Sequence, residues 1–254
     1  MRTAAQAAGH SRARALAAPG FTTIRAPRGV LYLRNDLALE AASVLKRLGE
    51  VDHASDAGAG NRRGGFRLDI NRQLTLFVRR ARRGGVMRLL NRDIYFGWQP
   101  RPLRELATAV EAMRRAIPIA EPLGALIEPL ALGFYRGAMI TRALAGMTLW
   151  EFLQTDDDAY VRSHILEQTR RAISTMHRGG LFHADLNLHN LFVTWRGESF
   201  AIAILDLDQA RLYPPPLKPK LCRQNLQRLV RSARKLDPDA RVLSPPALRV
   251  LTGD

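Results

Sequence analysis

Two aspartates and an asparagine in the last third of the chain have the side chains and spacing of a metal and phosphate site. Asp185 and Asn190 lie in the segment HADLNLHNLFV, and Asp206 follows the apolar run of AIAILDLDQA. Carboxylate and amide oxygens are hard ligands, and such ligands suit Mg²⁺ that carries a phosphate chain. If the three side chains converge, the sequence predicts a site for such an ion.

The spacing H-x-D-x-x-x-x-N, from His183 to Asn190, resembles that of phosphotransferases built like protein kinases. In those enzymes the aspartate accepts the proton of the acceptor hydroxyl, the asparagine holds metal, and a second aspartate bridges Mg²⁺ to the nucleotide. The resemblance implies that Asp185 is the catalytic base and that Asn190 and Asp206 are metal ligands. Any one of these residues alone would be uninformative, because a lone Asp or His in a loop is more often a cap or turn residue.

A β-hairpin must bring the two loops together. Leu191 to Trp195 is β-branched and aromatic, Arg196 to Glu198 is typical of a turn, and Phe200 to Leu205 is an apolar run. The outer ends of two paired strands lie side by side. The hairpin therefore predicts that Asn190 and Asp206 are neighbours.

Two helices are expected to flank the hairpin. Apolar residues recur on one helical face of Ala159 to Arg178, and Gly179-Gly180 ends that helix. The segment LCRQNLQRLVRSARKL, residues 221–236, predicts a second helix with arginines on its outer face. A solvated basic face is the ordinary explanation, and contact with an anionic membrane is the alternative. The residues from Pro238 onward are expected to be loosely ordered.

The first half of the chain has weaker signals. A glycine-containing turn that includes Gly64 and Gly65 precedes predicted strands at Phe66–Ile70 and Leu74–Val78, and its backbone N–H groups could approach phosphate. A plain hairpin loop remains the alternative, because a clean G-x-G-x-x-G is missing. A helix with its apolar face at 37–48 is expected to end before Gly49.

The usual strand lysine of a kinase-like fold is also missing. No lysine lies between Lys46 and Lys218, so an arginine must bind the nucleotide phosphates if that role is filled. Arg79 is the first candidate and Arg80 the second. The predicted partner is Glu105, on a helix expected from about 102 to 117, and it fits better than Glu111 because it lies in the first turns. A solvated helix-face glutamate is the alternative. Backbone groups from Arg142 to Leu144, in the link after the next strand, are predicted to meet a purine.

Composition bounds the class of protein. The chain has 254 residues, a formal net charge of +16 and one cysteine, Cys222. The charge calls for a polyanionic partner, which nucleic acid, anionic lipid or a phosphorylated glycolipid could supply. One cysteine excludes an internal disulfide and a cysteine zinc cluster, consistent with a reducing cytoplasm. The longest apolar region, 117–135, is interrupted by Glu and Pro and cannot span a membrane.

The chain is expected to divide into three parts: a disordered basic leader at 1–20, an N-terminal nucleotide-binding lobe at 21–141, and a C-terminal catalytic lobe at 142–254. A transit peptide would share the composition of the leader. The expected fold class is α+β, a protein-kinase-like fold with a small antiparallel-sheet lobe and a mostly helical lobe.

Several strings together resemble the lipopolysaccharide kinase family, and within it the 3-deoxy-D-manno-octulosonic acid (Kdo) kinases of Gram-negative bacteria. They lie between about Gly60 and Leu236 and are RRGG followed by NRDIYF, RELATA, ITRALAG, HADLNLHNLFV, ILDLDQA and NLQRLVRSARKL. The resemblance implies ATP with Mg²⁺, a Kdo-lipid A type glycolipid as acceptor, and work at the cytoplasmic face of the inner membrane. It also implies that Asn187 stands where protein kinases have lysine.

Other functions remain open at this point. The same site pattern is shared by kinases of other small alcohols, such as a heptose or an aminoglycoside. A catalytically silent scaffold is favoured by the missing lysine and opposed by the intact Asp185, Asn190 and Asp206. The arginine run 79–85 is the weaker indication of nucleic-acid binding, because it has no interleaved aromatic residues.

Overall fold

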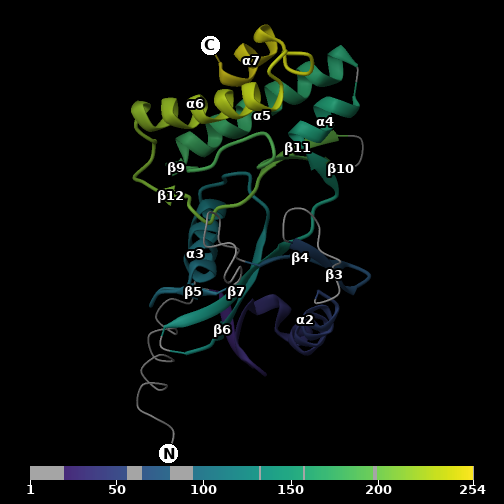
Figure 1. Cartoon of the computed structure of the whole chain (residues 1–254), viewed down its shortest axis with the longest axis vertical. Coiled ribbons are helices and arrows are strands. Elements are labelled where there is room, and N and C mark those ends of the chain that lie inside the picture. Colours follow the sequence, from purple (N-terminus) through teal and green to yellow (C-terminus); the bar gives the residue numbers. More distant parts are fainter. Residues whose placement is uncertain are drawn as a thin grey trace, which may run out of the picture. The chain divides into compact units, whose positions relative to one another are not determined.

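The computed structural model describes residues 20–55, 65–80, 94–131, 133–156, 158–196 and 199–253. The chain forms two compact units (Figure 1). The first unit comprises Met1–Val110 and Glu121–Ala143, and the second comprises Glu111–Ala120 and Leu144–Asp254.

The first unit is built on an antiparallel sheet with the strand order β1-β2-β6-β7-β4-β3, and β5 pairs with β7. Its elements are β1 (Phe21–Ala26), β2 (Gly29–Arg34), the 3₁₀ helix η1 (Asn35–Glu40), α2 (Ala41–Ser55), β3 (Gly65–Asn71), β4 (Leu74–Arg80), β5 (Tyr95–Phe96), α3 (Arg101–Arg114, whose last turn belongs to the second unit), β6 (Pro122–Pro129) and β7 (Phe134–Arg142). Side chains of a strand alternate between faces. In β4 the buried Leu74, Leu76 and Val78 therefore share one core face, and Arg79 points to the other.

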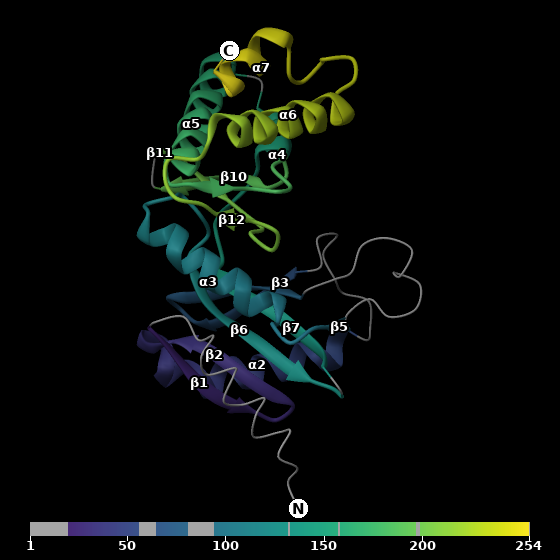
Figure 2. The same ribbon diagram turned by 90° about the vertical axis from the view of Figure 1, so that its left-hand side faces the viewer.

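The second unit is mainly helical (Figure 2). Its elements are β8 (Gly146–Thr148), α4 (Leu149–Thr155), α5 (Ala159–Arg178), β9 (Leu181–Phe182), β10 (Leu191–Arg196), β11 (Ser199–Ile204), β12 (Arg211–Leu212), α6 (Pro219–Leu236) and α7 (Pro245–Thr252). The predicted hairpin is confirmed as β10 and β11, with Leu191 opposite Ile204. The predicted end of α5 is confirmed as well: Gly180 has φ +80°, and a Cβ there would lie 2.4 Å from the Tyr213 carbonyl oxygen.

Two expectations about where the chain is helical are wrong. The helix expected to stop before Gly49 continues to Ser55, because one glycine inside a helix costs only about 1 kcal/mol. The segment after Pro238 is not loosely ordered throughout. Ser244 caps α7 by accepting a hydrogen bond from the Ala247 N–H, and Leu251 of this helix is fully buried. In the part of the chain that the structure describes, no helix has both the length and the apolar character needed to cross a membrane.

Candidate active site

Two antiparallel strand pairs frame the candidate site in the second unit. The loop 183–190 runs from β9 to β10, and the loop 205–210 runs from β11 to β12. Phe182 of β9 pairs with Arg211 of β12, and the Leu205 N–H donates to the Asn190 carbonyl at 2.8 Å. Because the two pairs connect the same two loops, both loops are held next to each other.

His183 ties the two loops together directly. Its side chain is buried, its Nδ1 lies 3.2 Å from the Asp185 backbone nitrogen, and its Nε2 lies 2.9 Å from the Leu205 carbonyl oxygen. Nδ1 must accept from the Asp185 N–H, so Nε2 carries the proton and donates to Leu205. Burial lowers the pKa of His183, against the opposing effects of the Leu205 carbonyl and nearby Asp206 and Asp185. The ring is therefore a neutral bridge, and protonation would break the bond to Asp185.

Two asparagine side chains fix the backbone at Asp185. The Asn190 Nδ2 donates to the Asp185 carbonyl at 2.8 Å, and the Asn187 Nδ2 donates to the same oxygen at 3.0 Å. The Asn187 Oδ1 accepts from the backbone N–H groups of His189 and Asn190. An amide whose nitrogen faces Asp185 turns its oxygen away from it, so the Asn190 oxygen can serve as a ligand to a cation.

Asp185 and Asp206 line the same small open pocket, with a volume of about 50 Å³. Its other lining residues are His183, Ala184, Asp208, Gln209 and Ala210. Asp206 has φ +59°, in the left-handed region, which Asp tolerates better than most residues. Asp206 is the second residue after β11, and this position and backbone conformation place it with Asp185 in the lining of the pocket.

The donor set fits Mg²⁺ held together with a phosphate chain. Mg²⁺ in such sites takes one or two protein carboxylates and completes its shell with phosphate oxygens and water. Asp206 offers a carboxylate in the pocket, and Asn190 offers an amide oxygen in the adjoining loop. Among the residues that the structure describes, no group of three or more His, Cys, Asp or Glu side chains could hold a metal ion.

Asn225 on α6 is a site residue that the sequence pattern did not reveal. It is fully buried, and its Nδ2 donates to the His183 carbonyl at 2.5 Å while its Oδ1 faces the His183 N–H at 3.4 Å. The same Oδ1 lies 3.3 Å from His177 Nε2 on α5. Burial lowers the pKa of His177, although the Asn225 contact opposes this shift. One side chain of α6 thus fixes the backbone two residues before Asp185.

In the first unit, the two charged residues expected to pair do so. The Arg79 Nη2 lies 2.6 Å from one carboxylate oxygen of Glu105 and 2.7 Å from the other. The Glu105 side chain is only 8% exposed and that of Arg79 is 23% exposed. The pair is therefore largely shielded from water, which excludes a solvated helix-face glutamate. Its contact with nucleotide phosphates remains a prediction.

We expect Arg79→Ala to lower the free energy of unfolding by about 3–5 kcal/mol, because it removes a guanidinium that contacts both oxygens of the buried Glu105 carboxylate. Arg79→Lys should lose less than half of that, since an ammonium keeps the charge. Arg47→Ala removes an exposed pair with Glu50 and should cost under about 1 kcal/mol. Urea unfolding of the three variants measures these losses. Equal losses for Arg79→Ala and Arg47→Ala would contradict the view that the Arg79 pair is desolvated.

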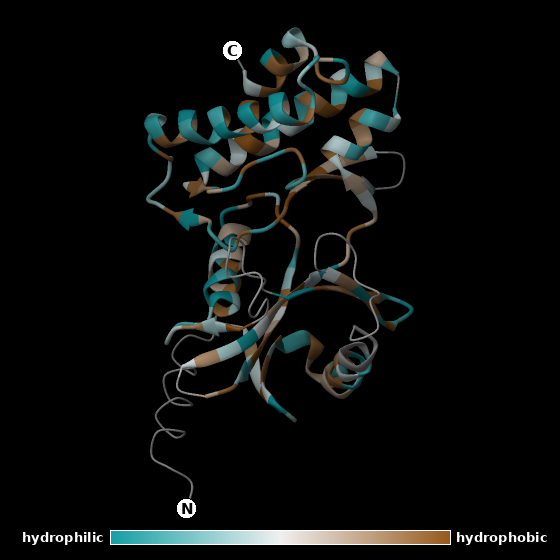
Figure 3. Ribbon diagram, in the orientation of Figure 1, coloured by the Kyte–Doolittle hydropathy of each residue, from teal (hydrophilic) through white to brown (hydrophobic). Residues whose placement is uncertain are grey.

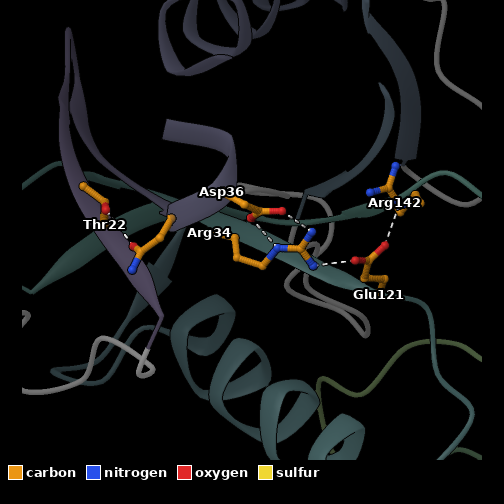
Figure 4. Close-up of polar contacts among 6 residues, drawn as sticks. Thr22, Arg34, Asp36, Glu121 and Arg142 are labelled. Carbon is orange, nitrogen blue, oxygen red and sulfur yellow. Dashed lines mark hydrogen bonds and ion pairs between the residues drawn. The ribbon is translucent and has the colours of Figure 1, made fainter. Parts of the chain in front are cut away.

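The predicted purine-facing segment begins beside a charged cluster in the first unit. Figure 4 shows Glu121 between Arg34 and Arg142, and it accepts hydrogen bonds from both. Arg34 also pairs with Asp36 at 2.6 Å. Burial raises the pKa of Glu121, but the hydrogen bonds from Arg142 and Arg34 outweigh this and hold that pKa below its usual range. The carboxylate thus stays charged and ties the ends of β2, β6 and β7.

Part of the backbone of this segment already forms hydrogen bonds within the fold. The Arg142 N–H donates to the Glu121 carbonyl and the Ala143 N–H donates to the Thr75 carbonyl, each at 2.9 Å, so neither of these N–H groups can face a purine. Leu144 is the next candidate in the sequence and belongs to the second unit. The adenine contact of both residues remains a prediction.

Two glycines, Gly64 and Gly65, were predicted to let the backbone approach phosphate. Gly64 lies outside the described residues. Gly65 is buried in β3, and a Cβ there would lie 2.3 Å from the Phe77 ring. Packing against Phe77 is therefore a sufficient reason for glycine at position 65.

Known proteins resemble this chain in sequence and fold. The family model described as "Lipopolysaccharide kinase (Kdo/WaaP) family" matches residues 52–243. A 3-deoxy-D-manno-octulosonic acid kinase of Xanthomonas campestris pv. campestris (strain B100) is 31% identical over 229 residues, which are 87% of each chain. One from Xylella fastidiosa (strain M23) is 33% identical over 162 residues, and the match spans 63% of this chain and only 61% of that relative's length.

The likeness extends to a solved structure. "WaaP in complex with acyl carrier protein" has a TM-score of 0.52 at 16% identity, and the match covers 88% of this chain and 89% of that one. At this identity the likeness concerns the fold. Together with a sheet-based first unit and a mainly helical second unit, it confirms the predicted α+β, protein-kinase-like fold.

Proposed function

We propose, because this chain belongs to the lipopolysaccharide kinase (Kdo/WaaP) family, that it is an ATP-dependent kinase of a sugar hydroxyl in lipopolysaccharide biosynthesis. The acceptor we propose is 3-deoxy-D-manno-octulosonic acid on a lipid A precursor. The observation that carries this proposal is the pocket of the second unit, where Asp185 and Asp206 lie together beside Asn190. A glycolipid acceptor would place the enzyme at the cytoplasmic face of the inner membrane, where its basic residues meet an anionic surface.

In this proposal each side chain of the site has one task. Asp185 orients the acceptor hydroxyl and takes its proton. Asn190 and Asp206 would hold Mg²⁺, and the ion would neutralise negative charge on the phosphate chain. His183, Asn187 and Asn190 keep the Asp185 backbone in place through the contacts described above. Catalysis then depends mainly on position and charge, as expected for phosphoryl transfer.

The first unit supplies a cation for the nucleotide in the same proposal. Arg79 takes the place of the usual lysine on the phosphates, and Glu105 holds its guanidinium in position. A guanidinium can bind two phosphate oxygens at once, so this substitution keeps phosphate binding possible. The backbone of Arg142 and Leu144 is assigned to the purine.

A product assay tests the function. The full chain is incubated with ATP, Mg²⁺ and a Kdo-lipid A precursor, and mass spectrometry follows the gain of one phosphate on the sugar. Parallel reactions offer a heptose or an aminoglycoside in place of the glycolipid. Phosphate transfer to the Kdo-bearing acceptor supports the proposal. Transfer only to another alcohol would show that the enzyme has another class of substrate. The absence of ATP-dependent transfer to any of these acceptors would contradict the proposal.

A further inference from the structure

The outer side of α6 is a row of basic residues, which we call the α6 basic face. It consists of Lys220, Arg223, Arg228, Arg231, Arg234 and Lys235, and all six are exposed. From Gln209 to Leu236 the sequence contains no Asp or Glu. Figure 3 shows this helix largely in hydrophilic colours. The +16 charge of the chain is therefore concentrated in part on one helix face.

The α6 basic face has no acidic partner in the described part of the chain. None of its six cations forms a salt bridge there, in contrast to several arginines elsewhere in the second unit. Arg115 lies 2.9 Å from Glu111, Arg170 lies 2.7 Å from Glu167, and Arg241 lies 3.2 Å from Asp239. The positive charge of α6 is thus left uncompensated within the fold.

Only the end of this face serves the stability of the helix: Arg234 and Lys235 lie in the last turn of α6, where cations offset the helix dipole. Residues three or four apart are neighbours on a helix, so Arg228, Arg231 and Arg234 repel one another, as do Arg231 and Lys235. The helix is held instead by its inner side, where Asn225, Leu229 and Ala233 are buried. A charged face whose neighbouring arginines repel one another and that pairs with no acid in the described fold indicates an external polyanion.

We propose that the α6 basic face binds the headgroups of an anionic phospholipid bilayer. The choice of a bilayer rests on the proposed function, because a glycolipid acceptor is itself held in a membrane. No exposed aromatic side chain lies on α6 to stack on nucleic-acid bases. The inner side of α6 holds His183, two residues before Asp185, so a bilayer on its outer side lies about one helix diameter, ~10–12 Å, from that loop.

The test measures lipid binding of the full chain without ATP or acceptor. The protein is sedimented with phosphatidylcholine vesicles that contain either no anionic lipid or one third phosphatidylglycerol. We expect binding to the anionic vesicles only, and binding should weaken as salt increases, since the Debye length shortens. The triple variant Arg228→Gln, Arg231→Gln, Arg234→Gln should bind at least tenfold more weakly, because each charge near a bilayer contributes about fivefold.

A matched control removes the same charge elsewhere in the same unit. The variant Arg170→Gln, Arg171→Gln, Arg241→Gln loses three arginines that already have acidic partners, and it should bind within about threefold of the wild type. Thermal unfolding shows whether both variants fold. The proposal is overturned if the two variants lose equal affinity for anionic vesicles or if the wild type does not bind these vesicles. It is also overturned if the wild type binds duplex DNA or an acidic protein more tightly than the vesicles.

Failure of this inference is distinguishable from failure of the kinase proposal. Phosphate transfer to an acceptor dispersed in neutral detergent does not need a charged bilayer. The α6 triple variant should therefore transfer phosphate in detergent at a rate within about twofold of the wild type, since exposed arginines contribute little to the fold. Loss of transfer in detergent together with normal vesicle binding would place α6 in the reaction itself and overturn the lipid assignment.

Discussion

Replacement of Asp185 by asparagine should lower kcat for phosphate transfer by about 10²–10⁴-fold, the usual contribution of a general base. Asparagine has nearly the same shape but cannot accept the hydroxyl proton at neutral pH. The fold should not respond, because the local contacts at this position use the Asp185 backbone. Its N–H donates to His183, and its carbonyl accepts from Asn187 and Asn190. We therefore expect the free energy of unfolding to change by no more than about 0.5 kcal/mol.

Two measurements decide this prediction. Transfer from ATP is followed under saturating substrate, and urea unfolding is followed for the same preparations. The control is Asp239→Asn, which removes an exposed carboxylate whose partner is Arg241 and should keep kcat within about twofold. Near-normal turnover by Asp185→Asn would eliminate Asp185 as the base, and with it the assignment of the pocket as a kinase site.

The sequence was most informative where local rules and chemistry coincide. The β10–β11 hairpin follows from two apolar runs around a polar turn, and the loops at its ends had to be neighbours. Arg79 and Glu105 were linked by elimination, because no lysine was present and one acid lay in the first turns of the next helix. Alternation along β4 explains why the link holds, since Arg79 lies on the face opposite the buried Leu76 and Val78.

The sequence was least informative where a polar residue serves tertiary contacts. Asn225 lies within an amphipathic helix where polar residues are expected at the surface, and only the fold shows that it meets His183 and His177. The helix α7 was missed because its two prolines indicated a stop. They lie in its first turn after the Ser244 cap, where proline needs no N–H partner. At Gly65 a Cβ would lie 2.3 Å from the Phe77 ring, across the pair of β3 and β4, a contact that the sequence alone did not indicate.

Only the structure shows where the unpaired positive charge of the chain lies. An arginine count cannot separate paired from unpaired side chains, and several arginines of the second unit are neutralised by nearby acids. The unpaired cations of α6 lie on its exposed side, away from the buried Asn225. The same helix therefore fixes the catalytic loop on one side and carries the uncompensated charge on the other.

Asn225→Ala should lower kcat by about 100-fold, the effect expected when a reacting group is displaced by about 1 Å. The substitution removes the amide that holds the His183 backbone, so the loop 183–190, which carries Asp185, loses an anchor at its start. The KM for ATP should change by less than about threefold, because the loss concerns the position of the base. Leaving the buried His183 carbonyl without its donor should also cost about 1–3 kcal/mol of stability.

Leu229→Ala separates the role of the amide from the stability of the helix. Leu229 is fully buried on the same side of α6, and its truncation should cost about 2–5 kcal/mol, as much as Asn225→Ala or more. Because Leu229 does not hold the loop, its kcat per folded molecule should stay within about threefold of the wild type well below the melting temperature. If both variants lose turnover equally, α6 acts only as a packing element. If only Asn225→Ala does, its amide positions the base.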